Sequence, residues 1–146
     1  MKKLISVILV AMLVFSCLPV AGAAETVATE KIEFDDGSYL IVETIRSGAR
    51  AAHSISGSKP YTYYNASDVA QWKATLYGTF TYTGSSATCT ASSISTTIYD
   101  SSWSTGSKSA SKSGNKATGS ATMKKSTVKS VPVSLSLSCS ASGSLS

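Results

Sequence analysis

Few residues in this 146-residue chain could carry out catalysis, although hydroxyl groups are plentiful. Ser and Thr number 30 and 16, but a serine nucleophile needs a base and a group that orients the base. His53 is the only histidine, and its Ser, Gly and Ala neighbours predict a solvated loop. Asp68 and Asp100 could form a glycosidase pair, but turn-forming residues adjoin both. We therefore expect no enzyme, no cofactor and no metal site.

Residues 1–23 have the features of a secretory signal peptide. A positive start at Lys2-Lys3 precedes an apolar run from Leu4 to Phe15, and small residues follow at 20–24. The run is shorter than the roughly 20 residues of a membrane span. Cys17 lies in a loose match to a bacterial lipobox, so lipid anchoring at Cys17 is the alternative to release. We expect a secreted, extracellular protein.

Cys89 and Cys139 are the cysteines that remain after removal of such a leader. An exported chain meets an oxidising environment, in which an even number of cysteines predicts a disulfide. No histidine or acidic cluster lies near either cysteine, which argues against a metal site. We predict a Cys89–Cys139 disulfide, with free thiols as the alternative.

Aromatic and basic residues are the remaining candidates for binding. Exposed aromatic rings can stack on sugars or insert at an interface, but tyrosines also cover sheet edges. Lysines can bind an anionic cell-wall polymer, a glycan or a membrane surface, and export argues against nucleic acid. The candidate aromatic residues are Tyr61, Tyr63, Tyr64 and Tyr77, and the candidate lysines are Lys108, Lys112, Lys116 and Lys124.

Charge is divided unevenly along the chain. Residues 24–45 hold six acidic residues against Lys31, a net charge of −5. Residues 46–146 hold ten basic residues against Asp68 and Asp100, a net charge of +8. The division is compatible with a solvated surface, or with a prosegment, residues 24–50, that is cut off near Arg46 or Arg50.

Alternating apolar and polar residues indicate β-strands throughout the mature chain. Val69 to Tyr82 alternates over 13 residues, and Val131 to Leu145 alternates with serines after Pro132. Asp36-Gly37 predicts a two-residue hairpin turn that sets Phe34 opposite Tyr39 within residues 24–46. Residues 47–59 lack periodicity and are expected to form a linker.

Two further hairpins are expected. A turn at Gly84-Ser85 would place Cys89 opposite Phe80, and a change of apolar parity after Ala91 predicts a bulge or a sheet-switching corner near Ser92-Ser93. The second hairpin turns near Ser113-Gly114-Asn115. An odd-numbered loop is preferred there, because a two-residue loop would bring Lys108 and Lys112 to the inner face.

These elements predict an all-β fold, an antiparallel β-sandwich that is immunoglobulin-like by analogy of architecture only. The expected organisation is a signal peptide (1–23), an acidic β-hairpin (24–46), a linker (47–59) and a Ser/Thr-rich sandwich domain (60–146).

Three stretches carry a resemblance to a known group of proteins. Residues Gln71–Cys89, Lys112–Ala117 and Leu137–Gly143 resemble segments of small exported two-cysteine β proteins of Firmicutes-type bacteria. The resemblance covers roughly residues 70–146. It implies export and a two-cysteine β domain, and it implies no activity and no site residue.

Two functions fit these features. The first is a secreted, non-enzymatic β-sandwich that acts as a binding or structural module at or beyond the bacterial cell surface. The second is a precursor: removal of the acidic segment 24–50 would release a basic, disulfide-closed domain with antimicrobial or toxin-like activity.

Overall fold

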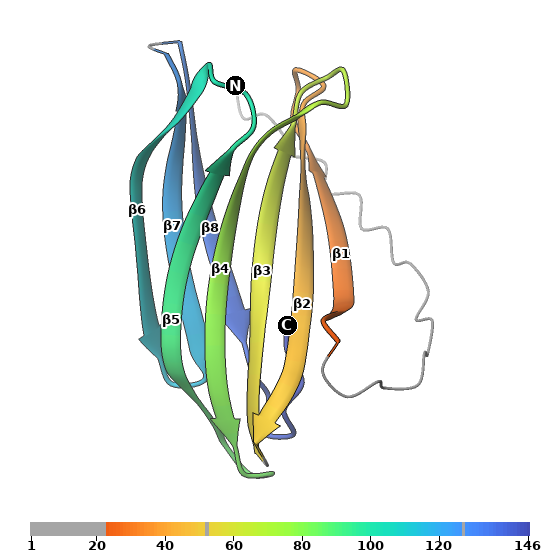
Figure 1. Ribbon diagram of the computed structural model, residues 1–146, viewed down its shortest axis with the longest axis vertical. Helices are drawn as coiled ribbons and strands as arrows, with labels where there is room; N and C mark the ends of the chain where they lie inside the picture. The colour runs from red at the N-terminus through yellow and green to blue at the C-terminus, as the bar shows by residue number, and fades with distance from the viewer. Residues whose placement is uncertain (1–22, 52, 127) are drawn as a thin grey trace, which may run out of the picture.

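The computed structural model describes residues 23–51, 53–126 and 128–146, which form eight β-strands (Figure 1). Within those ranges no helix is long and apolar enough to cross a membrane. The predicted signal peptide, apart from its last residue, and Cys17 lie outside the described residues. The strands are β1 (Glu25–Glu33), β2 (Tyr39–Ala51), β3 (Ser54–Tyr64), β4 (Ala70–Tyr82), β5 (Ala87–Ile98), β6 (Trp103–Ser113), β7 (Lys116–Lys125) and β8 (Lys129–Ser138).

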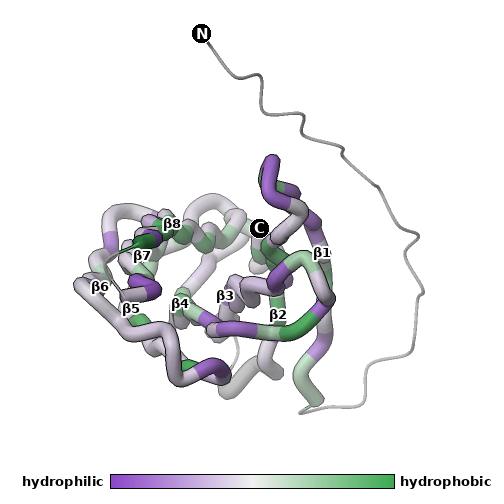
Figure 2. Tube along the Cα trace, turned by 90° about the horizontal axis from the view of Figure 1, so that it is seen from above, coloured by the Kyte–Doolittle hydropathy of each residue, from purple (hydrophilic) through white to green (hydrophobic). Residues whose placement is uncertain are grey.

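The described strands form two antiparallel sheets, β1-β2-β3-β4-β5 and β6-β7-β8. The sheets face each other and enclose the core, so the all-β, sandwich-like expectation is confirmed (Figure 2). Each strand within a sheet lies beside its neighbour in the sequence. An immunoglobulin domain instead has Greek-key crossovers, so the analogy does not extend to connectivity.

The alternating pattern of β4 and β8 correctly predicts which side chains form the core. Trp72, Leu76 and Phe80 of β4 and Leu137 of β8 are fully buried. Their apolar surface contributes about 25 cal/mol per Å² removed from water, which makes this face the main source of stability. β3 and β4 pack against β8 across the core.

The predicted linker, residues 47–59, is instead part of the sheet. β2 continues to Ala51, β3 begins at Ser54, and Gly57 of β3 pairs with Arg46. The backbone N–H and C=O groups of this serine-rich stretch form hydrogen bonds to neighbouring strands, even though its side chains show no apolar period. Because Leu40 and Val42 of β2 are buried, the hairpin, the supposed linker and residues 60–146 share one core.

The β1–β2 turn differs by one residue from the two-residue loop predicted at Asp36-Gly37. The amide of Phe34 donates to Ser38 O at 2.9 Å, so Asp35, Asp36 and Gly37 form a three-residue loop. Glu33, not Phe34, faces Tyr39. Gly37 has φ +78°, the left-handed position of such loops, which glycine adopts without steric cost.

The β4–β5 hairpin has the predicted register at its turn, with Phe80 opposite Cys89. The predicted bulge occurs at Thr90 rather than at Ser92-Ser93, because Thr79 pairs with Ala91. Ala91 is therefore exposed on the outer face and does not share the inner face with Cys89.

The β6–β7 hairpin contradicts the preferred odd-numbered loop. Gly114-Asn115 is a two-residue turn, and an extra residue between Thr105 and Lys108 forms a bulge. The bulge lets Trp103 point inward while Lys108 and Lys112 also share the face of the buried alanines of β7. Both lysines stay exposed because β6 is an end strand, so neither ammonium is desolvated.

The C-terminal alternation does not continue as one strand to Leu145. β8 ends at Ser138, and a turn at residues 140–144 brings Leu145 back beside Cys139. Gly143 has φ +86° in this turn, and Leu145 packs against the core. The turn covers the end of the sandwich that the β6–β7 hairpin also occupies.

Candidate functional site

The second sheet is the cationic part of the molecule. Residues 101–146, which contain β6, β7 and β8, hold six lysines and no acidic residue. The acidic residues are concentrated in β1, β2 and the turn between them. The division of charge along the sequence is therefore also a division between two parts of the structure.

The outer face of the three-stranded sheet is a surface of hydroxyl groups. Two rows cross the strands, and in each row the β6 and β7 hydroxyls are hydrogen-bonded, at 2.9 Å and 2.8 Å. A shallow depression of about 440 Å³ lies over the two rows, with Lys116 at its margin. The rows are Ser109, Ser120 and Ser134, and Ser111, Thr118 and Ser136.

This face can both donate and accept hydrogen bonds. In a bonded pair such as Ser111 and Thr118, one O–H is used within the pair, and the second O–H and several lone pairs stay available. The sheet spaces such groups about 4.8 Å apart across strands and about 6.8 Å apart along them. A regular array of hydroxyls beside an ammonium suits a hydroxyl-bearing chain with anionic groups.

The four candidate lysines do not form one outward-facing stripe. Lys116 and Lys124 adjoin the buried Ala117 and Met123 in β7, and so lie on its outer face. Lys108 and Lys112 lie on the inner face of β6, at the edge of the sheet that adjoins β5. Lys112 Nζ donates to Thr90 O of β5 at 2.6 Å, which joins the two sheets at that edge. The two-residue turn at Gly114-Asn115 sets Lys112 opposite Ala117, and so puts the two pairs of lysines on opposite faces.

The candidate tyrosines also divide between the two faces of the larger sheet. Tyr63 is 2% exposed and belongs to the core, and Tyr61 is half-buried against it. Burial, followed by the charge of Glu30, raises the pKa of Tyr61. Tyr64 faces outward and stacks on Tyr39 at 5.0 Å between ring centroids. Of the four, Tyr77 alone is exposed, with 45% of its surface accessible.

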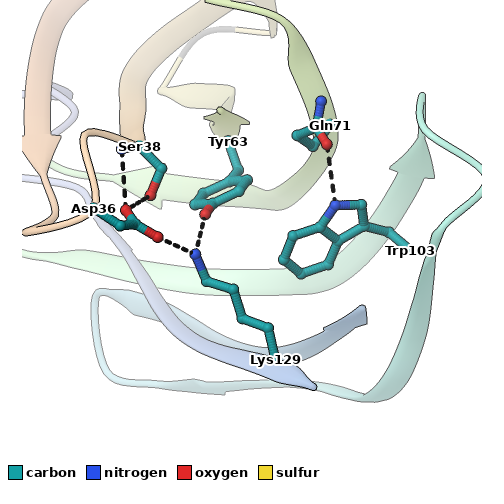
Figure 3. A network of polar contacts seen from close by, with 6 residues as sticks. All are labelled: Asp36, Ser38, Tyr63, Gln71, Trp103 and Lys129. Carbon is teal, nitrogen blue, oxygen red and sulfur yellow. Dashed lines mark hydrogen bonds and ion pairs between the residues drawn. The ribbon is translucent and has the colours of Figure 1, made fainter. Parts of the chain in front are cut away.

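A polar network joins the sheets at the end that carries the β1–β2 and β7–β8 turns (Figure 3). Lys129 Nζ donates to Asp36 Oδ2 and to Tyr63 Oη, each at 2.6 Å. Asp36 Oδ1 accepts from the amide and the hydroxyl of Ser38. Trp103 Nε1 donates to Gln71 Oε1 at 3.2 Å beside this network. Sequence reasoning missed Lys129, because no local pattern marks its distant partners.

The network shifts the titration of both members of its ion pair. The hydrogen bonds from Lys129 and Ser38 hold the pKa of Asp36 well below its usual range. Burial by itself would lower the pKa of Lys129, but the bonds to Asp36 and Tyr63 outweigh it and raise the pKa. The charged form of the pair is therefore favoured at neutral pH.

We expect the Asp36–Lys129 pair to stabilise the fold above the ordinary carboxyl range and to lose that contribution in acid. The folded pKa of Asp36 is depressed, so its contribution is complete above the unfolded pKa of about 3.9 and disappears as pH falls below it. The Asp36 side chain is 55% exposed, so solvent screening limits the effect to about 1 kcal/mol or less.

The measurement is the urea midpoint of the parent and of Asp36→Asn between pH 7 and pH 2. The parent should be the more stable at pH 7, and the two midpoints should converge in acid. A difference that stays constant with pH would show that the charge of Asp36 is not responsible.

The same end of the molecule is also apolar at its surface. Five of the seven exposed large hydrophobic side chains in the described ranges lie there. A cavity of about 330 Å³ opens between Phe34, Tyr63 and Val131, with the Asp36–Lys129 pair at its margin. The five residues are Phe34, Val69, Ile98, Tyr99 and Val128.

Cys89 and Cys139 come together at the opposite end, where the predicted disulfide is absent from the structure. Both are buried free thiols, and each Sγ donates to a nearby carbonyl, Ala91 O and Ser140 O respectively. The Cys89 amide donates to Gly114 O at 2.7 Å, and the Cys139 amide donates to Asn115 O at 3.0 Å. Burial raises the pKa of both thiols.

The residues considered for catalysis are held in turns. His53 is exposed with φ 64° in the β2–β3 turn, at the opposite end from Asp68 and Asp100. Asp68 accepts a hydrogen bond from Tyr39 Oη at 2.8 Å. Asp100 accepts from the Ser102 amide, which lowers its pKa. In residues 23–51, 53–126 and 128–146, no group of three His, Cys, Asp or Glu side chains could hold a metal ion.

Two surfaces of the molecule differ in chemical character. The outer face of the three-stranded sheet is polar and cationic, and the loop end around Phe34 and Lys129 is apolar. Comparison with models of protein families, with curated proteins and with solved structures found no match to this chain.

Proposed function

We propose that the protein is an exported, non-enzymatic binding module that holds an anionic, hydroxyl-bearing polymer of the cell surface. The polymer would lie on the outer face of β6, β7 and β8. The observation that carries the proposal is the depression lined by two rows of hydroxyls and Lys116, in a sheet with six lysines and no acidic side chain.

A polymer suits this face better than a compact small ligand. The depression is shallow and lined mostly by Ser and Thr, whereas sites for small ligands are concave and mostly apolar. The lysines supply long-range attraction to phosphate or carboxylate groups, and the hydroxyl rows supply short-range hydrogen bonds. Each such bond contributes about 0.5–1.5 kcal/mol net, so affinity would come from repetition along the polymer.

The test is co-sedimentation of the mature chain with insoluble walls of a Gram-positive bacterium, before and after acid extraction of their phosphate polymers. Binding should depend on the phosphate polymers and weaken as salt is raised, because exposed charges are screened. Thr118→Val with Ser120→Ala should weaken binding about three- to thirtyfold by removing two hydroxyls of nearly unchanged shape.

Lys116→Gln should weaken binding and reduce its salt dependence. The matched control is Lys73→Gln, which removes a lysine from the outer face of the other sheet. Equal binding to extracted and unextracted walls would contradict an anionic ligand. Equal loss in the Lys116 and Lys73 variants would contradict the assignment to this face.

The packing of β2 argues against the second hypothesis, release of a toxin-like domain by removal of residues 24–50. The cut would take β1 and almost all of β2 from the larger sheet, with the buried Leu40 and Val42. It would also remove Asp36, the partner of Lys129. The remaining domain would expose one long edge and part of its core.

A further inference from the structure

The two sides of the sandwich differ in how far they are closed. On one side β5 lies along β6, and Lys112 Nζ donates to Thr90 O between them. On the other side β1 and β2 extend past β8, the end strand of the smaller sheet (Figure 2). In the part of the chain that the structure describes, no strand lies along the free side of β8. An edge of this kind presents N–H and C=O groups to which another strand can bind.

Residues 144–146 already pair with one end of this edge. Ser138 and Ser146 exchange both backbone hydrogen bonds, at 2.9 Å and 3.0 Å. Leu145 lies opposite Cys139 in antiparallel pairing and packs against the core. An extended segment on this edge is therefore compatible with the fold, and it turns an apolar side chain inward between the two sheets.

The rest of the β8 edge is free in the same register. Backbone groups point alternately to the two sides along a strand, so those of Ser134 and Ser136 point away from β7, as those of Ser138 do. No backbone hydrogen bond from the described ranges reaches them on that side. Pro132 lies at the same edge, where a residue without an N–H is tolerated. The edge from Ser130 to Ser136 can therefore accept an added strand.

A half-buried lysine faces the inner side of this edge. Lys59 of β3 lies opposite the fully buried Leu76, so its side chain points into the space between the sheets. Burial lowers the pKa of Lys59 and outweighs the charge of Glu30, which raises it. Among the described residues no hydrogen bond or ion pair holds the ammonium. A carboxylate beside it would offset the cost of burying an unpaired charge.

The cavity of about 330 Å³ opens at the same edge. Phe34 and Tyr63 line it from the larger sheet, and Val131 lines it from β8. A residue that pairs opposite Val131 shares its face of the sheet, so its side chain would enter this cavity. The rings and the valine around it suit an aromatic or large aliphatic side chain.

The position of Lys59 along the edge follows from the packing of β3 on β8, which run in opposite directions. Gly57 of β3 lies beside Leu137 of β8. The next inward-facing residues of the two strands are Lys59 and Leu135. A residue that pairs opposite Leu135 is therefore the one that would meet the Lys59 ammonium.

We propose that an extended segment of a partner protein binds antiparallel along β8, at Ser130 to Ser136, and adds a fourth strand to the smaller sheet. Its aromatic or large aliphatic residue lies opposite Val131. Its acidic residue lies opposite Leu135 and meets Lys59. This site uses the backbone edge of β8, whereas the proposed polymer lies on the outer hydroxyl face, so the two functions are separable.

The probe is the peptide acetyl-Thr-Glu-Thr-Val-Thr-Phe-Thr-amide, titrated into the mature chain by calorimetry. Antiparallel pairing sets its Glu opposite Leu135 and its Phe opposite Val131. Binding should slow amide hydrogen exchange at Ser134 and Ser136, because both N–H groups gain acceptors. Absence of binding up to about 1 mM peptide, or slowed exchange confined to β1, the end strand of the larger sheet, would overturn the proposal.

Backbone methylation of the peptide tests strand pairing on the unaltered chain. N-methylation of the Thr opposite Ser134, whose N–H faces β8, should weaken binding about tenfold or more. N-methylation of the neighbouring Val, whose N–H points away from β8, is the matched control and should have a much smaller effect. Equal effects of the two modifications would show that the peptide does not extend the sheet.

A charge cycle tests the role of Lys59. The parent should prefer the Glu peptide to the same peptide with Gln by about three- to tenfold. Lys59→Met should bind the Gln peptide like the parent and lose this preference, and binding of that peptide also shows that the variant folds. A preference that survives in Lys59→Met would contradict the assignment of the carboxylate.

Two controls separate this site from the polymer face and from self-association. Thr118→Val with Ser120→Ala should bind the peptide like the parent, because both changes are on the outer face of β7. Sedimentation velocity of the parent gives the second control. Association that grows with concentration and is reversed by the peptide would assign the edge to a second copy of this chain, and would overturn the proposal of a separate partner.

Discussion

Oxidation of Cys89 and Cys139 to a disulfide is expected to raise the free energy of unfolding by about 4 kcal/mol, the entropic value for a loop of about 50 residues. The cysteines flank the Gly114-Asn115 turn, with both amides bonded to its consecutive carbonyls. Burial raises the pKa of Cys139, Arg46 lowers it, and the neighbouring Cys89 raises it again. The turn therefore holds both cysteines at one end of the sandwich.

The measurement is urea unfolding of the mature chain after air oxidation, with and without a reductant. The oxidised protein should be lighter by two hydrogen atoms per chain and should lose about 4 kcal/mol on reduction. Cys89→Ala with Cys139→Ala is the control, and its midpoint should not respond to the reductant. An unchanged mass and equal midpoints would show that the cysteines remain thiols.

Replacement of Trp72 by Ala is expected to destabilise the fold by about 3–5 kcal/mol, the usual cost of removing a buried aromatic side chain. Trp72 is fully buried, lies 5.1 Å from the ring of Tyr63 in a nearly parallel stack, and meets Trp103 edge to face at 6.0 Å. Its loss would leave a cavity where the two sheets meet.

Phe substitutions at the two tryptophans separate packing from hydrogen bonding. Trp72 Nε1 is buried with no hydrogen-bond partner, whereas Trp103 Nε1 donates to Gln71. Trp72→Phe therefore loses volume only, and Trp103→Phe also leaves the buried Gln71 oxygen without its donor. Chemical unfolding followed by circular dichroism measures all three variants. A loss below about 1 kcal/mol for Trp72→Ala would contradict the central place of the stack in the core.

Local patterns in the sequence were enough to predict the strands that bury one face. The apolar side chains of β4 and β8 face the core in the structure as predicted, although Gln71 and Thr75 of β4 are buried too. The Gly84-Ser85 turn also predicted the pairing of Phe80 with Cys89. In each case the pattern and the turn are local properties of a few consecutive residues.

Predictions failed where the outcome depended on loop length or on a distant strand. The β1–β2 and β6–β7 turns each differ from the predicted loop, and a change of one residue reverses which face a side chain occupies. Residues 54–59 of β3 gave no signal, because their serines and glycine carry no apolar period even though they pair with both neighbouring strands. The sequence makes Tyr63 a candidate binding residue, yet its burial beneath Lys129 and beside Trp72 depends on strands far along the chain.

The sequence by itself determined the all-β class, the buried faces of the long strands and the separation of acidic from basic segments, because period-two patterning and charge are properties of neighbouring residues. Only the tertiary structure decided which edges are open, which hydroxyls form rows and which lysines face outward. Those properties depend on which strands pair, on single-residue bulges and on which strand lies at the edge of each sheet. The contact of β6 with β5, through Lys112 and Thr90, likewise forms only when the two folded sheets meet.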